Sequence, residues 1–514
     1  MSPLALSAGT RFLASDLLEG RGTGTRGHEI AALWVSTQMQ SLGLEPAAGE
    51  GRWEQVVPLR AWVVDQESSS LLVHGPGRPP IRLLRGKDFV ALGDGELFEA
   101  ELDGALTFVG YGISAPEYGY DDLRGVDLKG KIAVVLHGAP SSDRPSFFPP
   151  APRATYASAD DKMRRLAARG AAGVIFAYTP EMERSYASWE AFSRSRRSEQ
   201  MAWTEGPVLG ERISGLAVRA LVSWQGFGKI VEAAGVPGGA RGILERAEQN
   251  RLAPQDWPLK AAMKTVSELR PARSSNVLGI LRGSDPVLAR ETVVVTAHLD
   301  HLGIGEPVDG DAIYNGAADN AVGVAVMLEV ARALAAQPRR PARSVLFAAV
   351  TGEEKGLLGS HYLAVHPVVE PGGIVADLNV DGAPTASPLE NAVARGAEHS
   401  SLGGAVRRAA DALQISLVPD PVPGAAVFVR SDQWSFVRVG IPSLYVTPGP
   451  ARDGDRAHTP RDEWNPAWLW GETARFARLQ FLLAWVVAGA GERPAWNPGD
   501  YFERYVRPAR PSAR

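Results

Sequence analysis

The chain has 514 residues, more than one ordinary hydrophobic core accommodates, so we expect at least two domains. Its 54 basic and 58 acidic side chains give a formal charge of −4. This balance carries no signal for polyanion binding, and we expect no nucleic-acid partner. Cysteine is absent, which excludes disulfides and leaves histidine and carboxylates as the ligands for a zinc-like ion.

The amino-terminal part shows two helical patterns, near Ser7 to Leu17 and Glu29 to Leu42. The glycine-rich segment Leu18 to Gly24 lies between them, and its plainest interpretation is a flexible connection. No signal peptide is visible, because the first residues lack a basic start and a sustained apolar stretch. The longest apolar run, Phe481 to Ala490, is too short to span a bilayer.

From about Leu97 the pattern changes to short strands broken by turns, at Ala105 to Gly112, Gly130 to Leu136 and Gly173 to Ala177. A helical stretch at Ser158 to Arg169 joins them, which indicates a small α/β unit.

A second strand series resumes at Ser275 to Leu281. Strands then alternate with helical stretches that begin near Asn320, Lys355, Ser400 and Glu472. This alternation predicts an α/β fold with a mixed sheet covered by helices on both faces.

Polar residues follow several of these apolar strands. His298 and Asp300 end the strand that begins at Thr292, and the pair Glu353 and Glu354 follows the strand Ser344 to Val350. Three further candidates are Asp319, Asp381 and His458. Two histidines and three carboxylates are the ligand mixture that a pair of zinc-like ions requires, and one glutamate is left over to act as a base.

Each candidate also has a plainer interpretation. Asp319 alone is typical of a cap for the helix Asn320 to Ala336, and the glutamate pair suits the start of the helix Lys355 to Val365, where acids favour the helix dipole. The joint pattern favours the metal site, because open α/β sheets bind ligands at the carboxyl ends of their strands.

Six segments along the chain together carry a family resemblance. They are AHLDHLG from 297, NGAADNAVGVAVMLEVARAL from 315, RSVLFAAVTGEEKGLLGSHYL from 343, LNVDG from 378, RSDQWSFVRVGIPSLYV from 430 and AHTPRDEW from 457. These segments resemble the co-catalytic zinc exopeptidase family, which includes aminopeptidase Y, bacterial secreted aminopeptidases, glutamate carboxypeptidase II and the transferrin receptor. The stretch FVGYGISAPEYGYDDLRGVDLKGKIAVVL from 108 resembles the protease-associated domain that this family often carries as an insertion. The resemblance implies a zinc exopeptidase fold with catalytic segments at 1–94 and 259–514 and a protease-associated insertion at 95–258.

The resemblance also implies the role of each site residue. His298 and Asp381 would hold one zinc ion, Glu354 and His458 the other, and Asp319 would bridge the two ions. Glu353 would be the general base.

Further roles follow for the neighbours of these residues. Asp300, two residues after His298 and on the same face if the strand continues, would accept the ring proton of that histidine. Asp462 would do the same for His458 or cap the turn at Pro460. Family members have a cis peptide bond after the bridging aspartate, and we expect the same bond here. His301, His361, His366 and His399 match no ligand position of the family, and surface or core roles are expected for them.

Two positions depart from the family. Ala457 stands where some relatives have a tyrosine that assists an oxyanion, a role that Tyr445 or zinc alone could fill. Gln433 stands where relatives commonly have histidine. Neither change touches the five proposed ligands.

The favoured function is a metal-dependent aminopeptidase that releases amino-terminal residues from peptides with two zinc ions. A carboxypeptidase is the alternative enzyme and would need a cationic pocket, for which Arg430 and Arg438 are available. A catalytically inactive binding protein, as the transferrin receptor is, is the alternative outside enzymes. The family implies a periplasmic or secreted location, with the cytoplasm as the alternative because no export signal is visible.

Overall fold

The computed structural model describes residues 1–77, 79–140, 147–423, 426–449 and 456–506. The chain forms two compact units. Unit 1 comprises Met1–Pro58, Arg273–Val422 and Val427–Arg514, and unit 2 comprises Leu59–Ala272 and Pro423–Ala426. Among the described residues, no helix has the length and apolarity needed to cross a bilayer.

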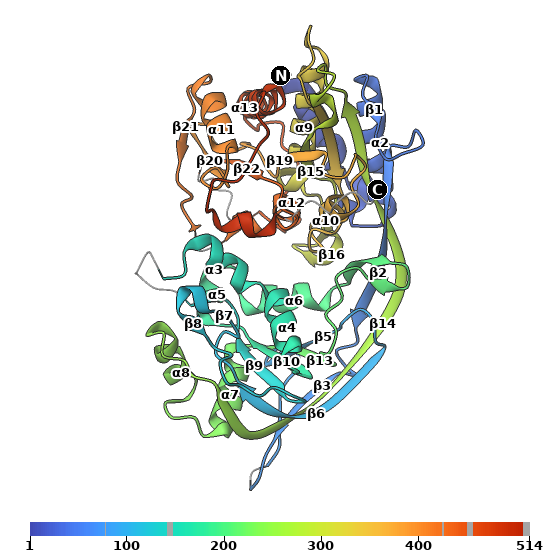
Figure 1. The fold of residues 1–514 in the computed structure, drawn as a ribbon. Coiled ribbons are helices and arrows are strands. Elements are labelled where there is room, and N and C mark those ends of the chain that lie inside the picture. Colours follow the sequence, from blue (N-terminus) through green and yellow to red (C-terminus); the bar gives the residue numbers. More distant parts are fainter. Residues whose placement is uncertain (78, 141–146, 424–425, 450–455, 507–514) are drawn as a thin grey trace. The chain divides into compact units, whose positions relative to one another are not determined.

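Four parallel strands form the centre of the unit 1 sheet. They lie in the order β18 (Ser344–Val350), β15 (Thr292–His298), β19 (Ile374–Asn379) and β22 (Ser443–Pro448). Strands β15, β19 and β22 are labelled in Figure 1. The first three are buried along their whole length, which explains their continuous apolar sequences. Antiparallel neighbours flank this centre. On one side, β14 (Gln255–Leu281) pairs with β18, and β1 (Glu45–Pro46) pairs with β14. On the other side, β20 (Asn391–Arg395) pairs with β22, and β21 (Ser416–Val418) adds a parallel pair with β20.

Helices cover both faces of this sheet, as predicted. Val345, Phe347 and Ala349 of β18 contribute to one core, and Leu346, Ala348 and Val350 to the other, because successive side chains of a strand alternate. The first core includes residues of α1 (Pro3–Leu13), α2 (Arg26–Ser41), α9 (Val322–Ala335), α11 (Leu402–Asp411) and α13 (Trp470–Gly489). The second includes residues of α10 (Leu358–Val365) and α12 (Gln433–Val437). Unit 1 also carries the two-stranded ribbon of β16 (Gly303–Val308) and β17 (Asp311–Tyr314).

Unit 2 has a mixed sheet of its own. Its strands lie in the order β5 (Phe89–Leu92), β13 (Val218–Val222), β10 (Gly173–Ala177), β9 (Ile132–Leu136) and β6 (Glu99–Phe108). The β5–β13 pair is antiparallel and the next three pairs are parallel. The early part of β14 pairs with β6 and with β3 (Ser70–His74). Strand β2 (Glu54–Val64) begins in unit 1 and ends in unit 2. The other strands and α-helices of unit 2 are β4 (Ile81–Arg82), β7 (Ser114–Ala115), β8 (Tyr120–Asp121), β11 (Gln200–Glu205), β12 (Val208–Leu209), α3 (Pro150–Ala157), α4 (Ala159–Ala168), α5 (Pro180–Ser185), α6 (Trp189–Arg197), α7 (Trp224–Ala234) and α8 (Gly239–Glu248).

Unit 2 is wider than the insertion predicted at 95–258. Strands β3 and β5 precede residue 95 and pair within unit 2, and the part of β14 up to Ala272 also belongs to it. The difference arises because β14 is one continuous strand of 27 residues, so no break in its sequence marks where the unit ends. The identity of unit 2 as a protease-associated domain stays a prediction.

Candidate metal centre

The strand ends of unit 1 place the predicted ligands. His298 is the last residue of β15, Glu354 follows β18, and Asp381 follows β19. His458 follows β22, and Asp319 lies in the turn that enters α9. Because parallel strands end at the same edge of a sheet, these side chains are brought to one place.

Two groups of side chains share Asp319. His298 Nε2 lies 3.1 Å from Asp319 Oδ1 and 3.3 Å from Asp381 Oδ1. His458 Nε2 lies 3.1 Å from Asp319 Oδ2 and 3.4 Å from Glu354 Oε2. Ligand atoms of a tetrahedral zinc ion lie about 3.3 Å apart when the bonds are roughly 2.0 to 2.1 Å long. The structure thus brings the five residues together in the grouping that the resemblance implies, with one oxygen of Asp319 facing each group.

Electrostatics in this cluster are dominated by crowded carboxylates. Burial and the adjacent Glu354 carboxylate raise the pKa of Glu353 well above its usual range, although His298 acts in the opposite direction. Burial also favours a high pKa for Asp319, but the imidazoles of His298 and His458 outweigh it and hold that pKa well below the usual range. Burial lowers the pKa of His298, and Asp381 and Asp319 more than reverse this. Such a cluster favours a bound cation.

Some buried polar atoms of this cluster have no hydrogen-bond partner in the described part of the chain, and they show whether the donor set fits zinc. Among the described residues, Glu354 Oε1 and both ring nitrogens of His301 are buried without a hydrogen-bond partner. Buried polar atoms are rarely left unpaired, and a bound ion is one explanation for those that are. Imidazole and carboxylate donors with these spacings fit a pair of zinc ions.

Asp300 differs from its prediction. The ring Nδ1 of His298 lies 3.0 Å from the main-chain carbonyl oxygen of Asp300, not beside its carboxylate. The carboxylate instead accepts from the main-chain N–H of Glu353 at 3.1 Å and from the Thr23 hydroxyl at 2.8 Å. The prediction assumed that β15 continues to Asp300, but the strand ends at His298 and the chain turns. Asp300 therefore contacts the loop of the proposed base.

Asp462 also has another partner. Its carboxylate accepts from the main-chain N–H groups of Ala318 at 2.8 Å and Asp319 at 3.0 Å. It thus fixes the backbone beside the shared aspartate. The peptide bond between Asp319 and Asn320 is cis, as the resemblance implies.

Arg21 is a site residue that the sequence analysis did not find. It is 1% exposed, and its guanidinium donates to the main-chain carbonyls of Leu299 at 3.0 Å, Asn315 at 2.6 Å and Gly316 at 2.9 Å. These carbonyls flank His298 and Asp319, so one cation ties both ligand loops together. With Thr23, it gives the glycine-rich segment a structural role. The sequence feature that could have indicated this role is an arginine within a glycine-rich segment.

The residues around Asp381 are also fixed. Its Oδ2 accepts from the Ser431 hydroxyl at 2.7 Å, and its main-chain carbonyl accepts from the Tyr445 hydroxyl at 2.9 Å. Gln433 accepts from Asn379 at 2.8 Å. The departure at Gln433 therefore keeps a hydrogen bond to the end of β19, and the oxyanion role of Tyr445 stays a prediction.

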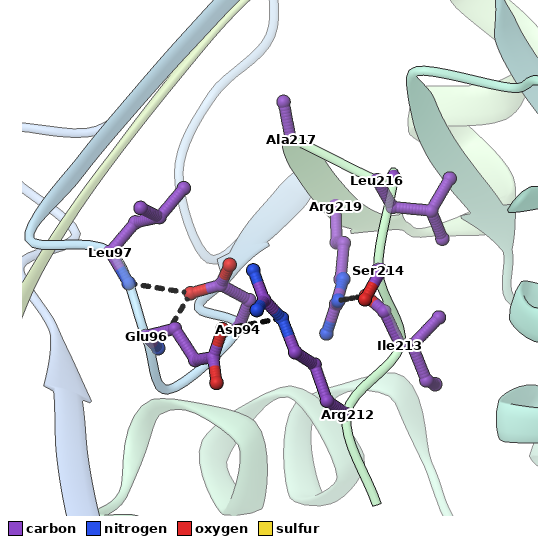
Figure 2. A pocket seen from close by; sticks show the side chains of 10 residues that line it. Asp94, Glu96, Leu97, Arg212, Ile213, Ser214, Leu216, Ala217 and Arg219 are labelled. Atoms are coloured by element: carbon purple, nitrogen blue, oxygen red, sulfur yellow. Dashed lines mark hydrogen bonds and ion pairs between the residues drawn. The ribbon is translucent and has the colours of Figure 1, made fainter. Parts of the chain in front are cut away.

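Unit 2 has a pocket of its own, shown in Figure 2. Arg212 Nε lies 2.7 Å from Glu96 Oε2, and Arg219 donates to the main-chain carbonyl of Ile213 at 3.0 Å. The sequence-predicted site residues are not among those that line it, and we assign it no function. Its lining residues are Asp94, Glu96, Leu97, Arg212, Ile213, Ser214, Gly215, Leu216, Ala217 and Arg219.

Comparisons with known proteins agree with this geometry. Residues 276–484 match the sequence model of Peptidase family M28, and this stretch contains all five clustered ligands. A probable zinc metalloprotease of Leptosphaeria maculans is 42% identical over 94 residues, which are 18% of this chain and 21% of that protein. One from Pyricularia oryzae is 41% identical over 95 residues, 18% of each chain. The matches thus span about a fifth of the length of these relatives.

A solved structure shares the fold over nearly the whole chain. The aminopeptidase from Aneurinibacillus sp. strain AM-1 aligns over 97% of both chains with a TM-score of 0.56 and 18% sequence identity. This likeness supports the α/β architecture. The match of residues 276–484 supports the M28 peptidase family for the part of the chain that carries the site.

Proposed function

We propose that this protein is a zinc-dependent aminopeptidase of the M28 type that uses two ions. The observation that carries the proposal is the sharing of Asp319 between two imidazole–carboxylate groups. His298 and Asp381 would hold one ion, Glu354 and His458 would hold the other, and Asp319 would be shared by both. The matches to M28 peptidases and to zinc metalloproteases support the same class of reaction.

The ions, when bound, polarise the peptide carbonyl and lower the pKa of the attacking water. Glu353 accepts the proton from that water and returns it to the leaving amine. Its main-chain N–H is held by Asp300, and Asp300 is in turn held by Thr23. The carboxylate of Glu353 forms none of the proposed metal contacts, which leaves it available for proton transfer.

The negative charge of the site favours a substrate that presents the amino end of a peptide. A free α-amine suits the acidic surroundings of Glu353 and Asp381, whereas a carboxypeptidase needs a cation at the site. Arg438, one of the two arginines considered for that purpose, donates to the ring Nδ1 of His361 at 2.6 Å. The complete ligand set argues against an inactive binding protein.

The test is a peptide panel with free and blocked ends, assayed with and without a chelator. We expect release of the first residue from peptides with a free amino end, whether or not the carboxyl end is blocked, and loss of this release with the chelator. Release from the carboxyl end would establish the carboxypeptidase instead. Zinc binding without turnover of any peptide would favour the binding protein.

We further propose that unit 2 is the protease-associated domain of this enzyme and that the protein acts outside the cytoplasm. Both statements rest on the family resemblance. Detection of the native protein in periplasmic or secreted fractions would test the second.

A further inference from the structure

His301 is a buried histidine beside the candidate metal centre that matches no ligand position of the resembled family. Its side chain is fully buried, and its ring Nδ1 lies 2.8 Å from Glu354 Oε1. We propose that His301 is an additional protein ligand of the ion held by Glu354, next to Asp319 and His458. This inference rests on the proposed two-ion site and deepens it.

The contact between His301 and Glu354 does not have the alignment of a hydrogen bond. Both atoms are buried, and neither has a hydrogen-bond partner among the described residues despite the short distance. A donor that pointed at the carboxylate would satisfy both atoms. Two ligands of one ion instead point at a third position between them, and the ligand atoms of a tetrahedral zinc ion lie about 3.3 Å apart.

The third donor of this group is Asp319. Ligand atoms from His301, Asp319 and Glu354 all lie within 4.8 Å of one another. The ring of His458 approaches the ring of His301 with centroids 5.8 Å apart at an interplanar angle of 63°. Two imidazoles therefore face the same pair of carboxylates.

The backbone holds the His301 ring in place. A Cβ atom on Gly316 would lie 2.5 Å from Cγ of that ring, so only glycine fits there, and Gly316 has the positive φ of 59° that glycine tolerates. The main-chain N–H of His301 also donates to the Arg21 carbonyl at 3.3 Å. The ring is thus fixed before an ion binds, which is the arrangement that a preformed ligand requires.

The two ions would then differ in their protein ligands. The first has His298, Asp319 and Asp381, while the second has Asp319, Glu354, His458 and His301. The side chain of His458 is 56% exposed, whereas that of His301 is fully buried. The second ion is therefore expected to persist when His458 is removed.

The test on the unmodified sequence uses the full chain with ¹¹³Cd in place of zinc and ¹⁵N-labelled histidine. We expect one ¹¹³Cd signal coupled to a single imidazole and a second coupled to two. One coupled imidazole for each ion would overturn the inference while leaving the two-ion site intact. Failure of the wild-type chain to bind two ions would instead refute the proposed function.

The matching variants are His301→Gln and, as a control, His399→Gln. His399 Nδ1 also lies 2.8 Å from a carboxylate, that of Asp500, but with hydrogen-bond alignment. We expect His301→Gln to lower the affinity for one ion by more than the roughly 10- to 100-fold that is typical when an outer hydrogen-bond partner is lost. The control should retain both ions. His458→Ala should still bind two ions. A loss below about tenfold in folded His301→Gln, or loss of the second ion in His458→Ala, would overturn the inference.

Discussion

Replacing Glu353 with glutamine separates proton transfer from metal binding at this site. Glutamine has the same shape, and the hydrogen bond that fixes the loop uses the main-chain N–H of residue 353, which the change leaves in place. General base catalysis contributes about 10²- to 10⁴-fold, so kcat should fall by that factor, equivalent to roughly 3 to 5 kcal/mol in the barrier. KM and zinc content should change little, because the variant removes a transition-state interaction only.

The adjacent position provides the matched comparison. Glu354→Gln makes the same chemical change one residue later, but it removes a proposed ligand and should reduce zinc content by one ion. Both variants require kcat, KM and metal content measured on the same folded preparations. Loss of zinc from Glu353→Gln, or turnover within about threefold of wild type, would refute the assignment of Glu353 as the base.

Two further predictions concern buried cations. Arg21→Lys should lower the free energy of unfolding of the metal-free protein by about 2 to 4 kcal/mol, because a lysine cannot donate to all the carbonyls that the guanidinium contacts. Unfolding in denaturant measures this change. A loss below about 0.5 kcal/mol would show that these bonds do not hold the ligand loops. Burial lowers the pKa of Lys162 from its usual 10.5 to about 7. Between these two values the unfolded chain binds more protons than the folded one, so the free energy of unfolding should rise with pH by up to about 1.4 kcal/mol per pH unit. Lys162→Met should remove that part of the slope in unfolding curves measured from pH 7 to 10, and an unchanged slope would contradict the assignment.

The strand ends predicted His298, Glu354 and Asp381 as candidate ligands, while the grouping of all five ligands came from the family resemblance. The strands that precede Glu354 and Asp381 are continuous apolar segments, so their carboxyl ends could be located without a structure. Parallel pairing then brings those ends together. The carboxylate of Asp300 was misplaced because its direction depends on where β15 stops.

Contacts between distant segments could not be read from the sequence at all. Arg21 is 278 residues from Leu299, and Asp462 is 144 residues from Ala318. Their hydrogen bonds go to main-chain groups, which leave no pattern in the sequence of the partner segment. The unit boundary within β14 could not be predicted for a related reason, because this one continuous strand pairs with strands of both units.

The buried guanidinium of Arg21 also bears on how the metal-free site tolerates its carboxylates. Burial lowers the pKa of Arg21 to about 10, while Asp462, Asp300, Asp319 and Glu354 act to raise it. The guanidinium therefore stays charged at neutral pH and supplies positive charge near the acids before any ion binds. The hydrogen bonds printed for its guanidinium go to main-chain carbonyls of Leu13, Leu299, Asn315 and Gly316, which leaves the carboxylate oxygens to the zinc ions. The fold can thus preform the site and still leave its carboxylate oxygens to the ions.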